Sequence, residues 1–399
     1  MTLFGLLGIV ISIAGFRFAR ANESRSRLAL FVLLLLMHLG AALAYFLYAQ
    51  SFGSDAKLYY YDEYNLFADG ENGLGTIFLV NFVQFLKTSV GGSYLDYFLL
   101  FQAAGFWGLL FVLRSFDEIH GELGQPNFNR FYLLLFLPGL HFWTSAIGKD
   151  GLVFLGVAMC TWAAFRLQTR YLVFGAGVVV ALLVRPHIAL IALVALALAV
   201  LLGRNTRMLT RIALLAVTVG GIFSVAGLVS DTFAGLNLTN ADAMTEFIQT
   251  RSNVNEESGG DIDIIGASFP VKLVSLLFRP LFIDATGMLG YAASLENLVL
   301  LLIVLTVLIR FRTALQVARG AMFARFAAIL FVTLTLLLAM VNYNVGLGLR
   351  QKMMVMPCLL SFFVALLAVR KARRQAAVYD LDPAAYAGTA RDRAPRSAF

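Results

Sequence analysis

Apolar runs long enough to cross a lipid bilayer recur from one end of this 399-residue chain to the other. About 20 consecutive apolar residues in a helix span the hydrocarbon core, which is roughly 30 Å thick. A backbone in lipid must satisfy its hydrogen bonds internally, so such runs fold as helices. With 60% hydrophobic and only 14% charged residues, the composition excludes an ordinary soluble domain. The sequence therefore predicts an all-α, polytopic integral membrane protein.

We expect about eleven transmembrane helices within one membrane domain, residues 1–374. The expected spans are 1–16, 28–50, 94–113, 131–147, 151–165, 171–184, 187–203, 212–230, 287–309, 322–342 and 353–369. The segment 375–399 has no apolar period, and we expect it to be a disordered tail. Both cysteines, Cys160 and Cys358, lie inside apolar runs, so no disulfide framework is implied.

The basic residues predict the orientation of these spans. Of the 31 lysines and arginines, 22 fall in the loops after the odd-numbered spans and in the tail, while 16 of the 23 acids fall elsewhere. The positive-inside rule makes the basic side cytoplasmic. We therefore expect the N-terminus outside and the C-terminus inside. The net charge of +8 is therefore explained by the orientation of the chain in the membrane. We expect the lipid bilayer as a partner and no nucleic acid.

Two outer loops are long, at 51–93 and 231–286. The first contains an apolar stretch at 75–92 that polar residues interrupt, which favours a helix lying at the membrane interface over a twelfth span. The second contains NVNEESGGDIDIIG, a polar stretch with glycines that we expect to be mobile.

Charged residues stand at the outer tips of two consecutive hairpins in the expected bundle. Lys149 and Asp150 form the first tip, and Arg185 and His187 flank a proline at the second. The helix at 171–184 rises only about 21 Å, which is less than the hydrocarbon thickness. Arg185 is therefore expected below the outer surface of the membrane.

A lone arginine in lipid costs at least about 2.5 kcal/mol, and non-helical backbone at that depth must face protein or water. We therefore expect the short hairpin helices to line a cavity that opens to the outside. Its lining residues would be Lys149, Asp150, Arg185 and His187. A plainer alternative makes Lys149 and Asp150 turn residues and Arg185 a residue that reaches the interface.

Three further residues are candidates for the same region. Arg350, in the short outer loop NYNVGLGLRQK, and Arg279, which precedes a proline, face the outer side in the expected topology. The plainer alternative makes Arg350 an ordinary arginine at the membrane boundary and Arg279 an anchor at the membrane interface. His141 lies within the expected span 131–147, where a satisfied interior histidine is the commoner explanation.

The first outer loop supplies candidate carboxylates. Five acids cluster among tyrosines there, and Asp62-Glu63 lies inside YYYDEY. Aromatic neighbours at the interface would partly dry this pair, and desolvation raises a carboxylate's pKa toward that of a general base. A solvated acidic loop is the alternative.

These features together resemble the GT-C membrane glycosyltransferases: many outward-facing helices, a carboxylate in the first long outer loop and basic residues at deep hairpin tips. The KD tip, the RPH tip and an NxGxxxR element (Asn344, Gly346, Arg350) also resemble bacterial envelope-polysaccharide proteins, including oligosaccharide-unit polymerases. The resemblance covers most of the chain as an architecture. The chain departs from some GT-C enzymes in having no large soluble C-terminal domain.

The resemblance implies sugar transfer between a polyprenyl-phosphate carrier and a glycan acceptor at the outer face of the bacterial cytoplasmic membrane. Asp62 or Glu63 would then serve as the base or as the partner of a divalent cation. The donor phosphate would bind Lys149, Arg185, Arg350 and Arg279, because guanidinium and ammonium groups stabilise an anionic leaving group in a low-dielectric site.

Three alternatives stay open. A repeat-unit polymerase would rely on the arginines without a carboxylate base. A transporter or flippase of lipid-linked sugars would also need charges at membrane depth, but usually has internal repeats. A non-catalytic partner in polysaccharide assembly would need no ordered carboxylate. The sequence does not distinguish oligomeric states.

Overall fold

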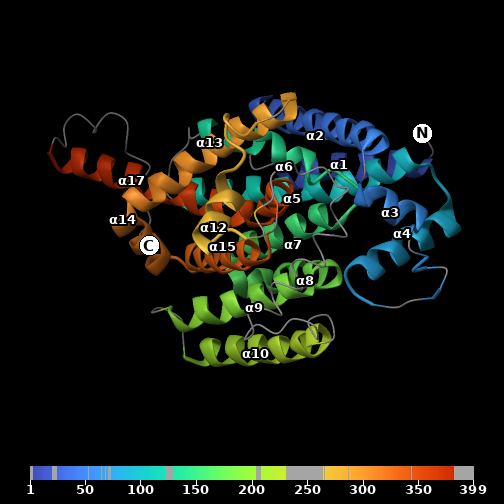
Figure 1. Ribbon diagram of the computed structural model, residues 1–399. Coiled ribbons are helices and arrows are strands. Elements are labelled where there is room, and N and C mark those ends of the chain that lie inside the picture. The colour runs from blue at the N-terminus through green and yellow to red at the C-terminus, as the bar shows by residue number, and fades with distance from the viewer. Residues whose placement is uncertain are drawn as a thin grey trace.

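A computed structural model of the chain is a bundle of helices (Figure 1). It describes residues 3–19, 25–52, 54–63, 65–67, 69–70, 73–122, 129–203, 208–230, 264, 266–285, 287–342 and 344–381. The α-helices of these residues are α1 (Leu3–Ala19), α2 (Arg25–Ser51), α3 (Asp55–Tyr61), α4 (Thr76–Val90), α5 (Tyr94–Glu122), α6 (Pro138–Phe142), α7 (Lys149–Ala163), α8 (Leu167–Val184), α9 (Pro186–Leu201), α10 (Met208–Ser230), α12 (Phe269–Phe278), α13 (Gly287–Ile309), α14 (Phe311–Gly320), α15 (Met322–Val341), α16 (Val345–Gln351) and α17 (Met356–Leu381). Three 3₁₀ segments join them: η1 (Asn129–Phe136), η2 (Ala164–Arg166) and η4 (Lys352–Val355).

Six stretches of these described residues are helical, long and apolar enough to cross a membrane. They are Ser26–Ser51, Tyr94–Gly121, Lys149–Val184, Gly287–Ile309, Met322–Val341 and Val345–Gln375. The third stretch joins α7 and α8, which the sequence predicted as two spans. Helices α1 and α9 are apolar but shorter. For the described residues the helical fold is confirmed, and six helices suited to cross a membrane fit the expected membrane protein. The count of eleven spans and their orientation stay predictions.

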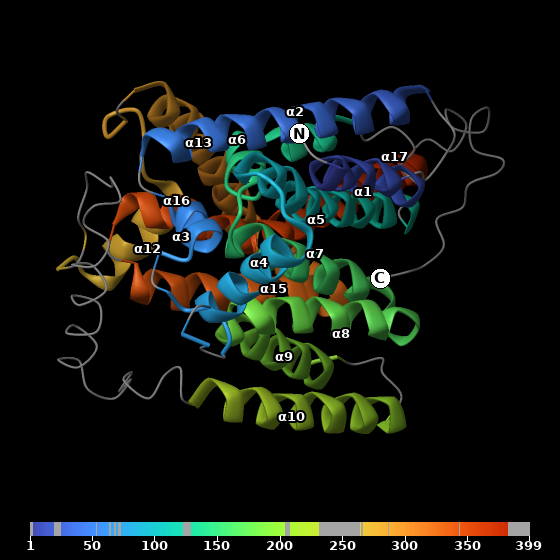
Figure 2. The same cartoon turned by 90° about the vertical axis from the view of Figure 1, so that its right-hand side faces the viewer.

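The long helices lie side by side across the view of Figure 2, from α2 at the upper edge to α10 at the lower edge. Helix α5 is central and packs against α1, α2, α7 and α17. The apolar stretch that includes α17 is almost entirely buried. Helix α10 packs against α9 at the edge of the bundle.

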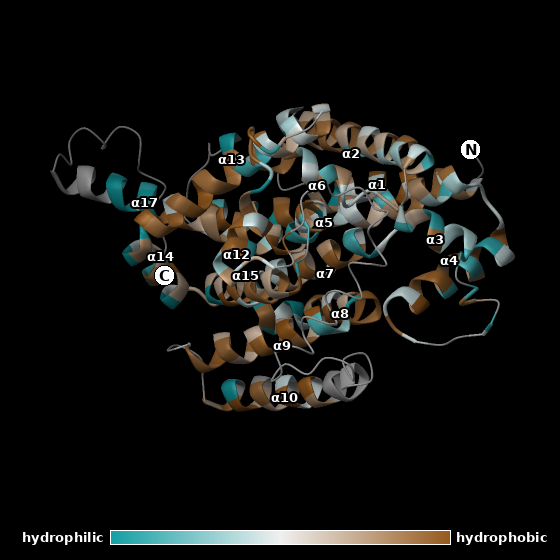
Figure 3. Ribbon diagram, viewed as in Figure 1, coloured by the Kyte–Doolittle hydropathy of each residue, from teal (hydrophilic) through white to brown (hydrophobic). Residues whose placement is uncertain are grey.

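Large apolar side chains remain exposed on the outside of this bundle. On α2, Leu33, Leu36, Leu43 and Leu47 are each more than half exposed. Figure 3 shows that apolar residues dominate the long helices. In water such a continuous apolar surface would drive association, whereas lipid tails solvate it. The exposed surface therefore fits a membrane protein.

The expected continuous span at 131–147 is wrong. The chain there forms η1, breaks at Leu137, forms the single turn of α6, and continues without a helix to Gly148. Pro138 explains the break, since proline lacks an N–H and disfavours a helical conformation in the residue before it. The non-helical residues Thr144 to Ile147 are all buried, so their backbone faces protein and not lipid.

Helices α7 and α8 cross at two glycines. A Cβ atom on Gly156 would lie 2.6 Å from the carbonyl oxygen of Gly177, and one on Gly177 would lie 2.6 Å from the carbonyl oxygen of Gly156. Small residues allow membrane helices to approach this closely. This crossing holds the two hairpins together and thereby fixes where their tips lie.

One end of the bundle gathers the short helices α3, α12 and α16 (Figure 2). The helix expected at 75–92 is present there as α4, which packs against α3. The polar stretch expected to be mobile lies almost entirely outside the described residues. Helix α17 continues to Leu381, so the first residues of the expected disordered tail are helical, and 382–399 lie outside the described residues.

Candidate functional site

A buried carboxylate at the start of α7 organises the candidate site. Asp150 is only 5% exposed. Its Oδ1 pairs with the guanidinium of Arg185 at 3.1 Å, and its Oδ2 accepts a hydrogen bond from Nε of Arg350. Arg185 lies between α8 and α9, and Arg350 lies in the last turn of α16. Three elements that are distant in sequence therefore meet at one carboxylate.

Arg350 also reaches a carboxylate from the long loop at 51–93. Its NH1 lies 2.6 Å from Oδ2 of Asp55, the first residue of α3. Ser54 caps this helix by accepting a hydrogen bond from the Ala56 N–H, and an acid in the first turn also suits the helix dipole. The Arg350 guanidinium lowers the pKa of the Asp55 carboxyl below its usual value, against the opposing effect of burial.

Lys149 completes the group. Its Nζ donates a hydrogen bond of 2.7 Å to Oγ1 of Thr76, at the start of α4. The lysine is close enough to interact electrostatically with Arg185, Asp55, Arg350 and Asp150. We refer to Asp55, Lys149, Asp150, Arg185 and Arg350 as the Asp150 cluster. The cluster contains three basic and two acidic side chains.

Close backbone packing holds the turn that leads into Lys149. A Cβ atom on Gly105 of α5 would overlap the carbonyl oxygen of Thr144, and one on Gly151 would lie 2.5 Å from the same oxygen. Asn344 fixes the other side, because its side chain caps α16 by accepting a 2.6 Å hydrogen bond from the Leu347 N–H. The asparagine of the NxGxxxR element therefore sets the position of the helix that carries Arg350.

The acids expected to be the base lie elsewhere in the first loop. Asp62 ends α3 with a left-handed backbone, at φ 53°, and its Oδ2 accepts a 3.0 Å hydrogen bond from the Phe67 N–H. Glu63 is exposed on the turn that follows. Neither forms an ion pair with the Asp150 cluster among the interactions of the described residues. A catalytic role for them stays a prediction, while Asp55 is the loop carboxylate that meets the arginines.

The other expected site residues divide between the cluster and separate contacts. Arg279 forms hydrogen bonds of 2.7 and 2.9 Å with the two oxygens of Asp284, so its expected place among the phosphate-binding residues is not supported by the geometry. Hydrogen bonding from Arg279 also lowers the pKa of Asp284. His187 lies in the first turn of α9, two residues after Arg185. His141 is completely buried in α6.

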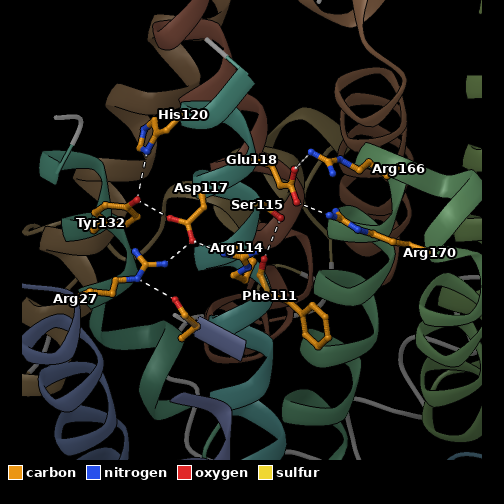
Figure 4. Close-up of polar contacts among 11 residues, drawn as sticks. Arg27, Phe111, Arg114, Ser115, Asp117, Glu118, His120, Tyr132, Arg166 and Arg170 are labelled. Atoms are coloured by element: carbon orange, nitrogen blue, oxygen red, sulfur yellow. Dashed lines mark hydrogen bonds and ion pairs between the residues drawn. The ribbon is translucent and has the colours of Figure 1, made fainter. Parts of the chain in front are cut away.

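A second polar cluster lies near the C-terminal end of α5 (Figure 4). Asp117 pairs with Arg27 and Arg114 and accepts a 2.7 Å hydrogen bond from the Tyr132 hydroxyl. Glu118 pairs in the same way with two further arginines, Arg166 and Arg170. Apart from the Arg114–Asp117 pair, which lies within α5, these contacts connect α5 to neighbouring segments of the bundle. We interpret this cluster as the anchor of the helix ends.

A metal ligand set is not evident in the part of the chain that the structure describes, where no three His, Cys, Asp or Glu side chains come close enough together. The chain matches no protein-family model, and no curated protein or solved structure matches it significantly. The resemblance to GT-C enzymes therefore rests on the sequence features alone and stays a prediction.

Proposed function

We propose that this protein is a membrane glycosyltransferase that takes sugar from a polyprenyl-phosphate-linked donor at the outer face of the bacterial cytoplasmic membrane. The observation that carries the proposal is the Asp150 cluster. It joins two arginines, a lysine and a half-exposed loop aspartate at one end of an apolar helix bundle. Envelope polysaccharides or glycoconjugates are the products that this chemistry serves.

The basic residues suit the leaving group of such a transfer. Cleavage of a sugar–phosphate bond leaves an anionic phosphate on the lipid carrier, and charge-assisted hydrogen bonds from guanidinium groups stabilise it. Asp150 holds Arg185 and Arg350 in fixed positions before the donor arrives, so little reorganisation is needed. Three basic side chains against two acidic ones favour an anion at the cluster.

Asp55 is the base that this geometry favours. Arg350 engages one of its oxygens, and 45% of the side chain stays exposed, so an acceptor hydroxyl can approach. In the resting protein the low pKa makes Asp55 a weak base. A donor phosphate that binds Arg350 competes with Asp55 for it. Donor binding therefore raises the basicity of Asp55 at the moment when a base is needed.

The proposal places the Asp150 cluster on the outer side of the membrane, with the N-terminus outside, the C-terminus in the cytoplasm and about eleven crossings. Reporter fusions test this orientation: one within 255–262 should read outside, and one after Arg207 should read inside. The excess of basic residues on the inner side is the reason. A cytoplasmic signal at 255–262 would turn the cluster inward and end the proposal.

The direct experiment begins with a deletion strain. Mass spectrometry of its lipid extract identifies the lipid-linked intermediate that accumulates, and that molecule serves as the donor for purified protein. Donor binding and turnover are then measured separately for wild type, Asp55→Asn, Asp62→Asn and Glu63→Gln. We expect Asp55→Asn to retain donor binding and to lose about 10²–10⁴-fold in turnover.

Asp284→Asn is the matched control, since it removes a carboxylate from an ion pair outside the cluster. If Asp62→Asn or Glu63→Gln loses turnover and Asp55→Asn does not, the base is in the YYYDEY segment. If all three variants turn over normally while Arg185→Ala is inactive, the mechanism is led by the arginines, as expected of a repeat-unit polymerase. A strain without accumulated lipid-linked sugar refutes both enzymatic proposals.

A further inference from the structure

Two histidines face each other in the interior of the bundle. His38 of α2 and His141 of α6 are both completely buried, and their Nδ1 atoms lie 3.2 Å apart. The ring centroids are 5.3 Å apart, with the planes inclined at 60°. This separation is a hydrogen-bond distance, and it requires a proton between the two nitrogens.

The other nitrogen of His141 must carry a proton of its own. Its Nε2 lies 2.8 Å from the carbonyl oxygen of Leu135 in η1. The residue three positions after Leu135 is Pro138, which has no N–H, and the next N–H, of Gly139, donates to Oε2 of Glu296. The Leu135 carbonyl therefore depends on the imidazole for its hydrogen bond, and a carbonyl can only accept.

His38 is in the same situation. Its Nε2 lies 3.0 Å from the carbonyl oxygen of Gln102 in α5, which also can only accept. Each imidazole therefore uses one ring nitrogen as a donor to backbone. In the neutral state each ring has a single N–H. The two Nδ1 atoms would then face each other with lone pairs only.

Three hydrogen bonds need three protons, and two neutral imidazoles bring two. This deficit holds for any choice of neutral tautomers, since in each of them one of the three contacts brings two lone pairs together. We propose that His38 and His141 form a binding site for one proton, shared between their Nδ1 atoms as N–H···N. The proposal does not depend on the glycosyltransferase function.

A metal ion does not fit between the two rings. Zinc sites in proteins use three or four protein ligands, and within the described residues no third His, Cys, Asp or Glu side chain joins this pair. The 3.2 Å separation of the two Nδ1 atoms suits a shared proton.

The charged groups around the two histidines do not take up this proton in their place. On α13, Glu296 reaches α6 at Gly139, two residues before His141, and interacts electrostatically with Lys352 of η4. On α2 and α5 the nearest described ion pair, Arg27 with Asp117, lies roughly 16 Å along α2 from His38. Burial disfavours the charged pair, and the third hydrogen bond favours it.

The shared proton has a structural consequence. It joins α2 to the broken segment η1–α6, which continues through the buried residues 144–148 directly to Lys149 and Asp150. When the proton leaves, two lone pairs oppose each other and the rings must separate. The contact between α2 and α6 therefore responds to proton binding, close in sequence to the Asp150 cluster.

Nitrogen NMR of the wild-type protein in lipid bilayers, labelled at the histidine ring nitrogens, tests the proposal without any substitution. The chain has four histidines. We expect one pair of Nδ1 signals that are coupled through a shared hydrogen bond. Near neutral pH the two rings together should carry one extra proton, so that one of them is an imidazolium. Two neutral rings protonated at Nε2, with no coupling down to about pH 5, would refute the shared proton.

Variants assign the signal and test its effect on stability. His38→Gln and His141→Gln should each abolish the coupling, whereas His120→Gln, at the far end of α5, should retain it. A group that gains proton affinity on folding stabilises the protein at low pH, and this stability is lost as pH rises through the folded-state pKa. Relative to His38→Gln, wild type should therefore lose thermal stability between about pH 5 and 8. A relative gain would show that burial keeps the pair neutral.

Discussion

Removal of the Asp150 carboxylate is the substitution that most directly tests the physical basis of the candidate site. In Asp150→Asn the side chain keeps its size but loses its charge, so Arg185 and Arg350 remain mostly buried beside a neutral amide. Arg350 retains Asp55 as an anionic partner at 2.6 Å. Arg185 loses the one ion pair that the described residues provide for it.

The expected magnitude follows from this asymmetry. Removing one partner of a buried ion pair typically costs about 3–5 kcal/mol, because the other charge stays buried without compensation. Since only one of the two arginines is left unpaired, we expect the lower limit, about 3 kcal/mol. The unfolding entropy is about 2.1 cal/mol/K per residue, so for a chain of this length the melting temperature should fall by roughly 4 °C.

Thermal unfolding in detergent, followed by intrinsic fluorescence, measures this difference. Asp284→Asn is the control, since it removes the same group from a pair whose side chains are about a quarter exposed. Solvent screens that pair, and the expected loss is below about 1 kcal/mol. The double variant Asp150→Asn/Arg185→Gln should be less destabilised than the sum of its single variants, because the uncompensated charge is gone. Equal losses for Asp150→Asn and Asp284→Asn, or simple additivity in the double variant, would refute the reasoning.

Three further predictions concern activity and packing. Arg185→Lys should reduce turnover by more than Asp284→Asn does, because a point charge replaces a planar fork in the contact with phosphate; full activity would remove Arg185 from the donor site. The acid limb of kcat/KM should lie below the usual pKa of an aspartate, because Arg350 stabilises ionised Asp55 and activity falls only as pH drops through this lowered pKa. The acid limb of kcat should lie at higher pH, because bound phosphate displaces Arg350 from Asp55. Gly156→Leu should lower the melting temperature and reduce activity together, since its side chain would enter the backbone of α8; a variant with normal stability would show that the close α7–α8 crossing is not required.

Much of the membrane fold and part of the candidate site could be predicted from the sequence. Hydropathy marked the long helices, because lipid admits only internally bonded backbone. The two charged hairpin tips were expected to lie near each other, and Arg185 and Asp150 do form an ion pair across them. The placement of Arg350 at the same carboxylate depends on the capped helix α16, whose motif the sequence contains as Asn344 and Gly346.

The parts that the sequence did not predict depend on local backbone chemistry and on distant packing. A single proline, Pro138, converts an apolar run of spanning length into a 3₁₀ segment and an isolated turn. The expectation that Asp62 or Glu63 is the base came from the surrounding tyrosines, but Asp62 ends helix α3 and its carboxylate binds the backbone of the following loop. Ser54, directly before Asp55, is a helix-capping signal that could have placed Asp55 at the start of a helix.

Adjacent residues at a helix start point in different directions, and this explains why the Lys149-Asp150 pair interrupts the apolar sequence. Successive side chains on a helix diverge by about 100°. Asp150 therefore turns inward to the two arginines, while Lys149 turns to Thr76 at the start of α4. The acid fixes the arginines, and the lysine adds a third basic group to the cluster. If the two residues have these separate roles, Lys149→Gln should weaken donor binding without the loss of stability expected of Asp150→Asn. The reason is that Thr76 is a neutral partner, which can stay hydrogen-bonded to the glutamine amide. A thermal loss in Lys149→Gln equal to that of Asp150→Asn would show that both residues are structural and that the cluster has no vacant positive charge for a phosphate.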